Sequence, residues 1–261
     1  MNKTMLITGA GRGIGLATAR HFARQGWIVG LYDINREAID ALLAGDEFAG
    51  ACGGHCDVTD RASVSDMLEH FGRHTDGRLD VLVNNAGVLS AGEFADMSLD
   101  DCDAMIDINV RGLTLVSSLA FPLLRQTAGA SLVNLCSVSS VHGIPTLAVY
   151  SSSKFYVNGF TEALALEWRK HDIHVTCVKP PLVNTTMGHT VTGGLDSRMN
   201  IDTEPEDVAE AIQRAIEGSG SGYFIGGTST IWSLLDRWLP ERARHWLTAY
   251  LTGYNKQQGV N

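Results

Sequence analysis

The stretch that decides the fold reads Thr8-Gly9-Ala10-Gly11-Arg12-Gly13-Ile14-Gly15. It follows a short apolar run, residues 3–8, and precedes a helical pattern over residues 16–25. Strand, glycine loop and helix in this order are the context of a dinucleotide-binding loop. Glycines let the backbone approach a pyrophosphate, and the start of the helix offers unpaired N–H groups and the positive end of its dipole. The alternative is an ordinary tight turn between strand and helix. Residues further along the chain have to distinguish it from a dinucleotide-binding loop.

A carboxylate ends the second apolar run, residues 27–32. Asp33 follows Gly15 at close to the ~20-residue spacing of the acidic residue that binds ribose hydroxyls. A carboxylate there repels a 2′-phosphate and favours NAD(H), whereas the Arg12 guanidinium could bind that phosphate and favours NADP(H). We give Asp33 the greater weight and expect NAD(H), with NADP(H) as the alternative. Asp33 could also cap a helix that begins near Asn35.

Apolar runs alternate with helical patterns along the whole chain. This alternation predicts an α/β fold, a Rossmann-type doubly wound domain with a mainly parallel seven-stranded sheet flanked by helices. No linker or repeat divides the chain, so we expect one domain over residues 1–261, with a substrate lid at about 185–204 and a C-terminal tail at about 230–261. The expected strands are residues 3–8, 27–32, 51–56, 79–83, 130–136, 173–179 and 223–225.

Two polar features lie in the middle of the chain. Asn85-Ala86-Gly87 comes directly after the expected strand 79–83, where small residues let a ligand lie close to the sheet. Asn109 lies inside an expected helix over about 98–124, although its amide competes for backbone groups there. Asn109 is therefore either a buried structural residue or a mark of a helix irregularity beside a site.

Tyr150 and Lys154 are four residues apart, which places them on one face of a helix, one turn from each other. A nearby ammonium favours phenolate and lowers a pKa that starts near ~10. A phenol tuned in this way can give or take a proton. The ordinary explanation is a helix face without chemistry. Ser137 ends the strand before this helix and lies thirteen residues before Tyr150.

Composition excludes several classes of protein. The 261 residues carry a formal net charge of -9, which argues against binding nucleic acid by bulk electrostatics. No apolar run approaches the ~18 residues of a membrane span, and no signal peptide is visible, so we expect a cytoplasmic protein. Five cysteines fit reduced thiols. Cys52 and Cys56 are interpreted as packing residues, and no metal site is expected.

Taken together, these motifs resemble the short-chain dehydrogenase/reductase family over nearly the full length of the chain. Each motif is weak alone, but their order and spacing are highly specific. The residues that carry the resemblance are Thr8-Gly9-x-x-x-Gly13-Ile14-Gly15, Asp57-Val58, Asn84-Asn85-Ala86-Gly87, Asn109, Ser137 and Tyr150-x-x-x-Lys154.

The resemblance implies a role for each matching residue. Tyr150 would be the general acid in reduction and the base in oxidation, and Lys154 would lower its pKa. Ser137 would hydrogen-bond the substrate oxygen, and Asn109 would help to hold a water-linked proton path to Lys154. The residues implied to bind the nicotinamide cofactor are Gly9, Arg12, Gly13, Ile14, Gly15, Asp33, Asp57, Val58, Asn85, Ala86, Gly87, Tyr150, Lys154, Pro180, Val183 and Thr185.

One position departs from the family pattern, which often has Pro-Gly where this chain has Pro180-Pro181. A second proline is rigid and lacks an N–H, so the departure puts the shape of that loop in question more than cofactor binding. The substrate would be a small-molecule alcohol or carbonyl compound. Its candidate contacts are Ser137, His142 and Met187, and the apolar lid residues Met187, Val191, Leu195 and Met199 indicate an apolar or mixed molecule.

The C-terminal tail is rich in large apolar residues, among them Trp232, Trp238 and Trp246. We interpret it as packing on the body of the protein or on another subunit, with shallow membrane contact as the less favoured alternative. The resemblance also implies a homodimer or homotetramer, formed through the helices around residues 98–124 and 150–170. A non-catalytic dinucleotide-binding redox sensor is the alternative to an enzyme, although such a protein would not need Ser137, Tyr150 and Lys154 together.

Overall fold

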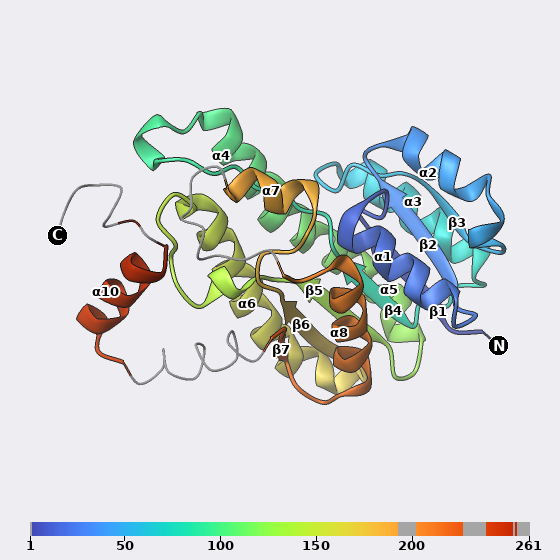
Figure 1. Ribbon diagram of the computed structural model, residues 1–261. Coiled ribbons are helices and arrows are strands. Elements are labelled where there is room, and N and C mark those ends of the chain that lie inside the picture. The colour runs from blue at the N-terminus through green and yellow to red at the C-terminus, as the bar shows by residue number, and fades with distance from the viewer. Residues whose placement is uncertain (1, 193–201, 227–238, 253, 255–261) are drawn as a thin grey trace.

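Seven parallel strands form one sheet at the centre of the molecule, in the order β3-β2-β1-β4-β5-β6-β7 (Figure 1). The computed structural model describes residues 2–192, 202–226, 239–252 and 254. The predicted doubly wound α/β fold is confirmed. The strands are β1 (Thr4–Thr8), β2 (Ile28–Asp33), β3 (Cys52–His55), β4 (Val81–Asn84), β5 (Ser131–Leu135), β6 (His174–Lys179) and β7 (Gly222–Phe224).

The central strands are covered on both faces, which explains their continuous apolar runs. Every residue of β1, β4 and β5 is buried. β3 forms at one edge although Gly53 and Gly54 disfavour a strand. Its pairing with β2, which sets Leu31 opposite Gly53, overrides that local preference.

Helices form a layer on each face of the sheet (Figure 1). One layer packs Phe22 of α1 and Ile212 of α8 against the sheet, and the other packs Phe71 of α3, Val116 of α5 and Leu164 of α6. The helices are α1 (Gly13–Ala23), α2 (Arg36–Leu43), α3 (Arg61–His74), α4 (Leu99–Ile106), α5 (Leu113–Gln126), α6 (Ala148–Glu167), α7 (Thr186–Thr192), α8 (Pro205–Glu217) and α10 (Glu241–Thr252).

Side-chain caps fix where several helices begin. The side chain of Asn35 accepts from the N–H of Ala38 and caps α2, so Asn35 has the capping role that the sequence analysis considered for Asp33. Asp60 caps α3 in the same way. At α8, Glu204 and Asp207 form a reciprocal capping box around Pro205. The caps of α2 and α3 hold the segments after β2 and β3 in place.

The helix expected over residues 98–124 is interrupted in the structure. α4 passes into a π-helical turn, Asp107–Gly112, and then into α5. The whole stretch, Leu99–Gln126, is long and apolar enough to cross a membrane by length and composition, which differs from our expectation that no stretch would be. Leu113, Val116 and Leu124 of α5 are buried in the protein core, as in a helix that covers a sheet.

The thiols lie inside the protein. All five cysteines are free and buried. Cys52 and Cys56 pack in the apolar cluster under α3, as expected from the sequence.

Candidate active site

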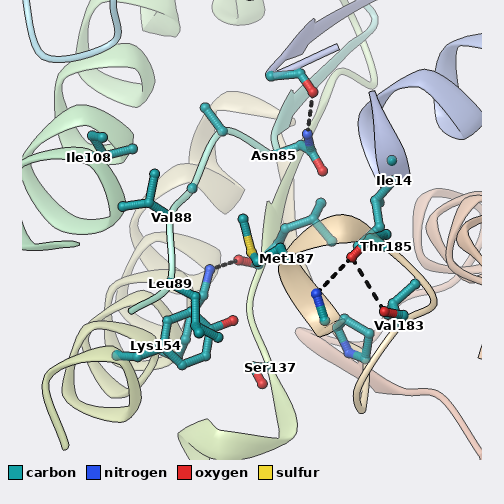
Figure 2. A pocket seen from close by; sticks show the side chains of 18 of the residues that line it. Ile14, Asn85, Val88, Leu89, Ile108, Ser137, Lys154, Val183, Thr185 and Met187 are labelled. Atoms are coloured by element: carbon teal, nitrogen blue, oxygen red, sulfur yellow. Dashed lines mark hydrogen bonds between the residues drawn. The ribbon is translucent and has the colours of Figure 1, made fainter. Parts of the chain in front are cut away.

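A cavity of about 940 Å³ opens at the carboxyl ends of the central strands. The loops that follow β1, β2, β4, β5 and β6 each contribute to its walls, and Figure 2 shows side chains from several of them around one space. An open parallel sheet binds its ligands at this edge, where neighbouring loops diverge. The cavity is therefore the candidate active site.

The glycine loop after β1 forms one end of the cavity. Gly9, Arg12, Gly13 and Ile14 line it. Gly9 has a φ of 67°, a left-handed conformation that favours glycine. Gly15 does not line the cavity, but a Cβ there would overlap the carbonyl oxygen of Gly9. Gly15 therefore lets α1 pack tightly against the loop, and the loop leaves an open cradle at the start of α1.

The carboxylate of Asp33 is fixed beside this cradle. One of its oxygens accepts from the N–H of Gly11 and the other from the N–H of Asn35, each at 2.9 Å. Two backbone donors hold the side chain in one orientation at the end of β2, where it lines the cavity. A carboxylate at this fixed position can accept hydrogen bonds from the hydroxyls of a ribose. The cradle and the carboxylate together fit an adenine dinucleotide.

The loop after β4 is tied to the loop after β1. The side-chain amide of Asn85 donates to the carbonyl oxygens of Thr8 and Gly9, each at 2.9 Å, and Figure 2 shows one of these two bonds. Ala86 and Gly87 line the cavity beside Asn85. Asn85 thus fixes the position of the small residues that line the cavity.

Asp57 and Val58 line the same part of the cavity from the segment after β3. One carboxylate oxygen of Asp57 accepts from both the N–H and the hydroxyl of Thr59, at 2.8 and 2.7 Å. These local bonds fix the side chain, and Val58 is buried against the π-helical turn at Gly112. Both residues line the cavity, and their role in binding a cofactor stays a prediction.

Lys154 and Tyr150 reach the cavity from the first turns of α6. The Lys154 ammonium is buried, donates to the carbonyl oxygen of Leu135 at 2.8 Å and lies 5.6 Å from the centre of the Tyr150 ring (Figure 2). The ammonium thus faces the ring of Tyr150 and the end of β5. This geometry brings the two predicted residues together.

The pKa of Tyr150 differs in direction from the sequence-based expectation. Burial raises the pKa of Tyr150 above that of a free phenol, the nearby Cys136 raises it further, and a hydrogen bond with Ser137 lowers it by less. Burial also lowers the pKa of Lys154. The expected lowering of the phenol pKa is therefore not found in the protein by itself, because burial and Cys136 together outweigh the opposing effect of Ser137.

Ser137 lies at the end of β5 and begins a 3₁₀ turn, Val138–Ser140. Its hydroxyl oxygen accepts from the N–H of Ser139 at 3.2 Å, and its side chain is near enough to Tyr150 to lower the pKa of that phenol. Ser137 lines the cavity next to Tyr150. The two hydroxyls can therefore contact one and the same ligand oxygen.

Asn109 does not line the cavity but supports its wall. It is buried in the π-helical turn, where its amide donates to the carbonyl oxygen of Val88 at 2.9 Å and to the hydroxyl of Ser153 at 3.2 Å. Its amide oxygen accepts from the N–H of Val88 at 2.9 Å. Both explanations considered for Asn109 hold, since it is a buried anchor at a helix irregularity beside the site.

The loop after β6 closes the cavity on the other side. Pro180, Pro181, Val183 and Thr185 all line it, so the second proline is accommodated at the wall. The Thr185 hydroxyl donates to the carbonyl oxygen of Val183 and accepts from the N–H of Gly188, which joins this loop to α7 (Figure 2).

The base of the expected lid is held by side chains that sequence reasoning did not single out. The Asn184 amide donates to both carboxylate oxygens of Glu204, at 2.9 and 3.1 Å. His189 of α7 contacts the amide oxygen of Asn184 at 2.9 Å. Asn184 and His189 both line the cavity, as does Met187. Leu195 and Met199 lie outside the described residues, and Val191 belongs to α7.

An apolar wall faces Tyr150 and was also missed from the sequence. Leu147 is buried in a cluster with Leu89, Ile144, Leu182 and the Tyr150 ring, and all five line the cavity. These residues come from loops without periodicity, so no sequence signal separates them from other loop residues. His142, which the sequence analysis proposed for the substrate, is half-buried and does not line the cavity.

The described residues form no cluster of metal-binding side chains. Across the described residues, no three histidine, cysteine, aspartate or glutamate side chains gather in a way that could hold an ion.

Relatives of the chain are dehydrogenases and reductases. It is 35% identical over 234 residues to meso-2,3-butanediol dehydrogenase of Serratia marcescens, covering 87% of this chain and 92% of the relative. It is 34% identical over 196 residues to D-threitol dehydrogenase of Mycolicibacterium smegmatis, covering 74% of each. Its structure resembles 3-ketoacyl-(acyl-carrier-protein) reductase of Brucella melitensis complexed with NADH, with a TM-score of 0.78 and 28% identity over 87% of this chain and 98% of that one.

The family model described as short chain dehydrogenase matches residues 3–195, a range that contains the glycine loop, Asp33, Ser137, Tyr150 and Lys154. The chain therefore belongs to the short-chain dehydrogenase/reductase family of oxidoreductases.

Proposed function

We propose that this protein is an NAD(H)-dependent oxidoreductase that interconverts a secondary alcohol and its ketone. One observation carries the proposal: Ser137, Tyr150 and Lys154 line the same cavity as the glycine loop and Asp33. A dinucleotide held at the glycine loop and a substrate held at Ser137 would share that space. The proposed enzyme is one dehydrogenase domain over residues 1–261.

The nicotinamide cofactor, when bound, supplies or accepts the hydride. Tyr150 moves the proton: its hydroxyl donates to the carbonyl oxygen in reduction and, as phenolate, accepts from the alcohol in oxidation. Ser137 donates a hydrogen bond to the same oxygen and fixes its position. Lys154 binds the ribose next to the nicotinamide and keeps a positive charge beside Tyr150, and Asn109 supports the wall that carries Val88.

Asp33 supports NAD(H) as the preferred cofactor. Its carboxylate is fixed by Gly11 and Asn35 next to the cradle, where it repels an added phosphate. Arg12 lines the same end of the cavity and provides the only argument we find for NADP(H). The remaining proposed contacts are Asp57, Val58, Asn85, Ala86, Gly87, Pro180, Val183 and Thr185, which all line the cavity.

The substrate end of the cavity combines hydroxyls with an apolar wall. Ser137 and Tyr150 supply the polar contacts, and Leu89, Ile144 and Met187 supply apolar ones. This combination supports a small alcohol or ketone of mixed character. The names of two relatives, which act on butanediol and threitol, add vicinal diols to the compounds worth testing.

Assembly into a homodimer or homotetramer is part of the proposal. Large apolar side chains are exposed on the two helices predicted to form the interface, namely Leu99 and Ile106 of α4 and Phe155 and Leu166 of α6. Leu99 and Leu166 are 78% and 76% exposed, which is a large apolar area to leave in water. The proposed location is the cytoplasm, with a small molecule and no nucleic acid as partner.

The test is turnover of secondary alcohols and ketones by the purified protein with NAD(H) and NADP(H). We expect cofactor reduction or oxidation with at least one vicinal diol or simple secondary alcohol. Binding of the cofactor without turnover of any member of a broad panel would favour the alternative, a non-catalytic dinucleotide-binding redox sensor.

A further inference from the structure

One buried hydroxyl beside the cavity has no hydrogen-bond partner among the described residues. Ser139 is 2% exposed, lines the cavity, and its hydroxyl oxygen makes no hydrogen bond with any described residue. A buried hydroxyl without a partner is costly, so native proteins rarely leave one in place. Of the buried side-chain atoms without a partner in the described part of the chain, only that of Ser139 belongs to a residue lining the cavity.

Ser139 is held next to the residues that contact the reacting oxygen. Its N–H donates to the hydroxyl oxygen of Ser137 at 3.2 Å, within the 3₁₀ turn Val138–Ser140. Ser137 in turn lines the cavity together with Tyr150. A ligand oxygen seated between Ser137 and Tyr150 would therefore have Ser139 on the neighbouring part of the wall.

Several other polar groups near the substrate end already have hydrogen-bond partners. The Asn184 amide is bound to Glu204 and His189, and the Thr185 hydroxyl is bound to Val183 and Gly188. The Ser140 hydroxyl, on the same turn, donates to the carbonyl oxygen of Ser137 at 2.7 Å. Ser139 is thus the buried hydroxyl in this wall that still needs a partner.

We propose that Ser139 recognises a second oxygen of the substrate, on the carbon next to the reacting one. This inference rests on the proposed function and narrows the substrate to vicinal diols and α-hydroxyketones. The Ser139 hydroxyl is closed off from solvent in the protein by itself, so it has to turn about χ1 to meet the ligand, a change between staggered rotamers that serine makes readily. Ser139 then sets specificity, while Ser137 and Tyr150 act on the reacting oxygen.

The experiment compares 2,3-butanediol with 2-butanol, two substrates that differ by one hydroxyl. Wild type is expected to prefer the diol, because a site built to bind a hydroxyl rejects an analogue that lacks it. Ser139→Ala should lower kcat/KM for the diol roughly 5- to 150-fold, the cost of one buried hydrogen bond left unmade, and should leave kcat/KM for 2-butanol within about 2-fold.

Thr176 supplies a matched control. Its hydroxyl is also buried without a partner in the described structure, but Thr176 lies in β6 and does not line the cavity. Thr176→Val removes that hydroxyl and keeps the shape of the side chain, so the ratio of the two kcat/KM values should equal that of wild type. Ser139→Thr retains a hydroxyl and should recover part of the preference for the diol.

Two results would overturn the inference. One is a wild-type enzyme whose kcat/KM for 2-butanol equals its kcat/KM for the diol. The other is a Ser139→Ala enzyme that loses both activities equally, which would mean that Ser139 only supports Ser137. Absence of all turnover in wild type would count against the proposed function itself. In that case, binding of the diol to the protein with NAD+, measured by calorimetry, still tests Ser139, and equal affinity of wild type and Ser139→Ala would reject it.

Discussion

Lys154 donates a hydrogen bond to the backbone carbonyl of Leu135, so the ammonium on α6 is anchored to the last residue of β5. The residues on either side of this bond carry the proposed chemistry, since Tyr150 lies one turn before Lys154 and Ser137 lies two residues after Leu135. The bond therefore couples the orientation of the two halves of the site. It also explains why the ammonium faces the ring of Tyr150, at 5.6 Å from its centre.

Tyr150→Phe should abolish most activity and leave the fold intact. The change removes only the hydroxyl, and loss of general acid-base catalysis costs ~10²–10⁴-fold in rate. Tyr156→Phe is the matched control, because the Tyr156 hydroxyl bonds to Thr114 outside the cavity. Steady-state kinetics and cofactor titration provide the measurements. A Tyr150→Phe enzyme with near wild-type turnover would reject the assigned role and redirect attention to Ser139.

In the protein without cofactor, the pKa of Tyr150 should lie above that of a free phenol. Burial raises the pKa of Tyr150, so the folded state favours the neutral phenol. The resulting stabilisation is fully present below the unfolded pKa of ~10 and is lost as pH rises from there through the folded pKa. Ultraviolet difference titration of wild type against Tyr150→Phe measures this. Phenolate appearing below pH ~10 would show that Lys154 outweighs burial.

The pH dependence of turnover should have opposite signs in the two directions. Oxidation needs the phenolate of Tyr150 as base, so kcat/KM for the alcohol should rise with pH, and kcat/KM for the ketone should fall. The sequence argument places the apparent pKa in turnover below ~10, because of the Lys154 ammonium, whereas burial raises the pKa in the protein by itself. The measurement is kcat/KM against pH for oxidation and for reduction over the same pH range. The apparent pKa from these profiles is then compared with the pKa of Tyr150 in the protein without cofactor.

Asp33→Ala should narrow or reverse the preference for NAD(H) over NADP(H). The carboxylate that repels the 2′-phosphate is removed, and Arg12 remains at the same end of the cavity. Titration of both cofactors into wild type and the variant gives the ratio of the Kd for NADPH to the Kd for NADH in each protein. Equal or tighter binding of NADPH by wild type would assign the deciding role to Arg12, for which Arg12→Ala is the check.

Asp80→Asn should destabilise the fold by about 1–3 kcal/mol at pH 7, since it disrupts charge-assisted hydrogen bonds between the starts of β1 and β4. Burial alone raises the pKa of Asp80, but hydrogen bonds from Arg78 and Thr4 outweigh it and leave that pKa below its usual value. The lowered pKa means that the contribution is present above pH ~4 and is lost on further acidification.

Urea unfolding of wild type and Asp80→Asn at several pH values tests this linkage. The difference in unfolding free energy should shrink as pH falls through the folded pKa of Asp80. Glu69→Gln, which removes an exposed ion pair with Arg73 within α3, is the control and should change stability by less than about 1 kcal/mol. A difference that stays constant with pH would contradict the assigned linkage.

Deleting residues 230–261 should change the oligomeric mass or the solubility. Trp246 and Tyr250 of α10 stack on each other and are 62% and 53% exposed, and Tyr254 bonds to Glu93. Trp232 and Trp238 lie outside the described residues. Size-exclusion chromatography with light scattering provides the mass. An unchanged mass together with loss of binding to lipid vesicles would favour the membrane alternative.

The sequence alone determined the fold class and predicted most of the residues that line the end of the cavity at the glycine loop. The glycine loop, Asp33, Asn85 and the Tyr150–Lys154 spacing depend on local geometry, namely helix periodicity and the tight turn after a buried strand, so their placement follows from neighbouring residues. Alternating apolar runs likewise predicted the parallel sheet, because strands covered on both faces are continuous in apolar residues.

Only the tertiary structure decided how distant segments meet. The π-helical turn around Asn109, the apolar wall of Leu147 and Leu182, and the Asn184–Glu204 contact join residues that no short-range pattern connects. The same holds for the pKa of Tyr150. Its direction depends on a balance between desolvation and nearby charge, which is set by packing around the ring and not by the spacing of Tyr150 and Lys154 along the helix.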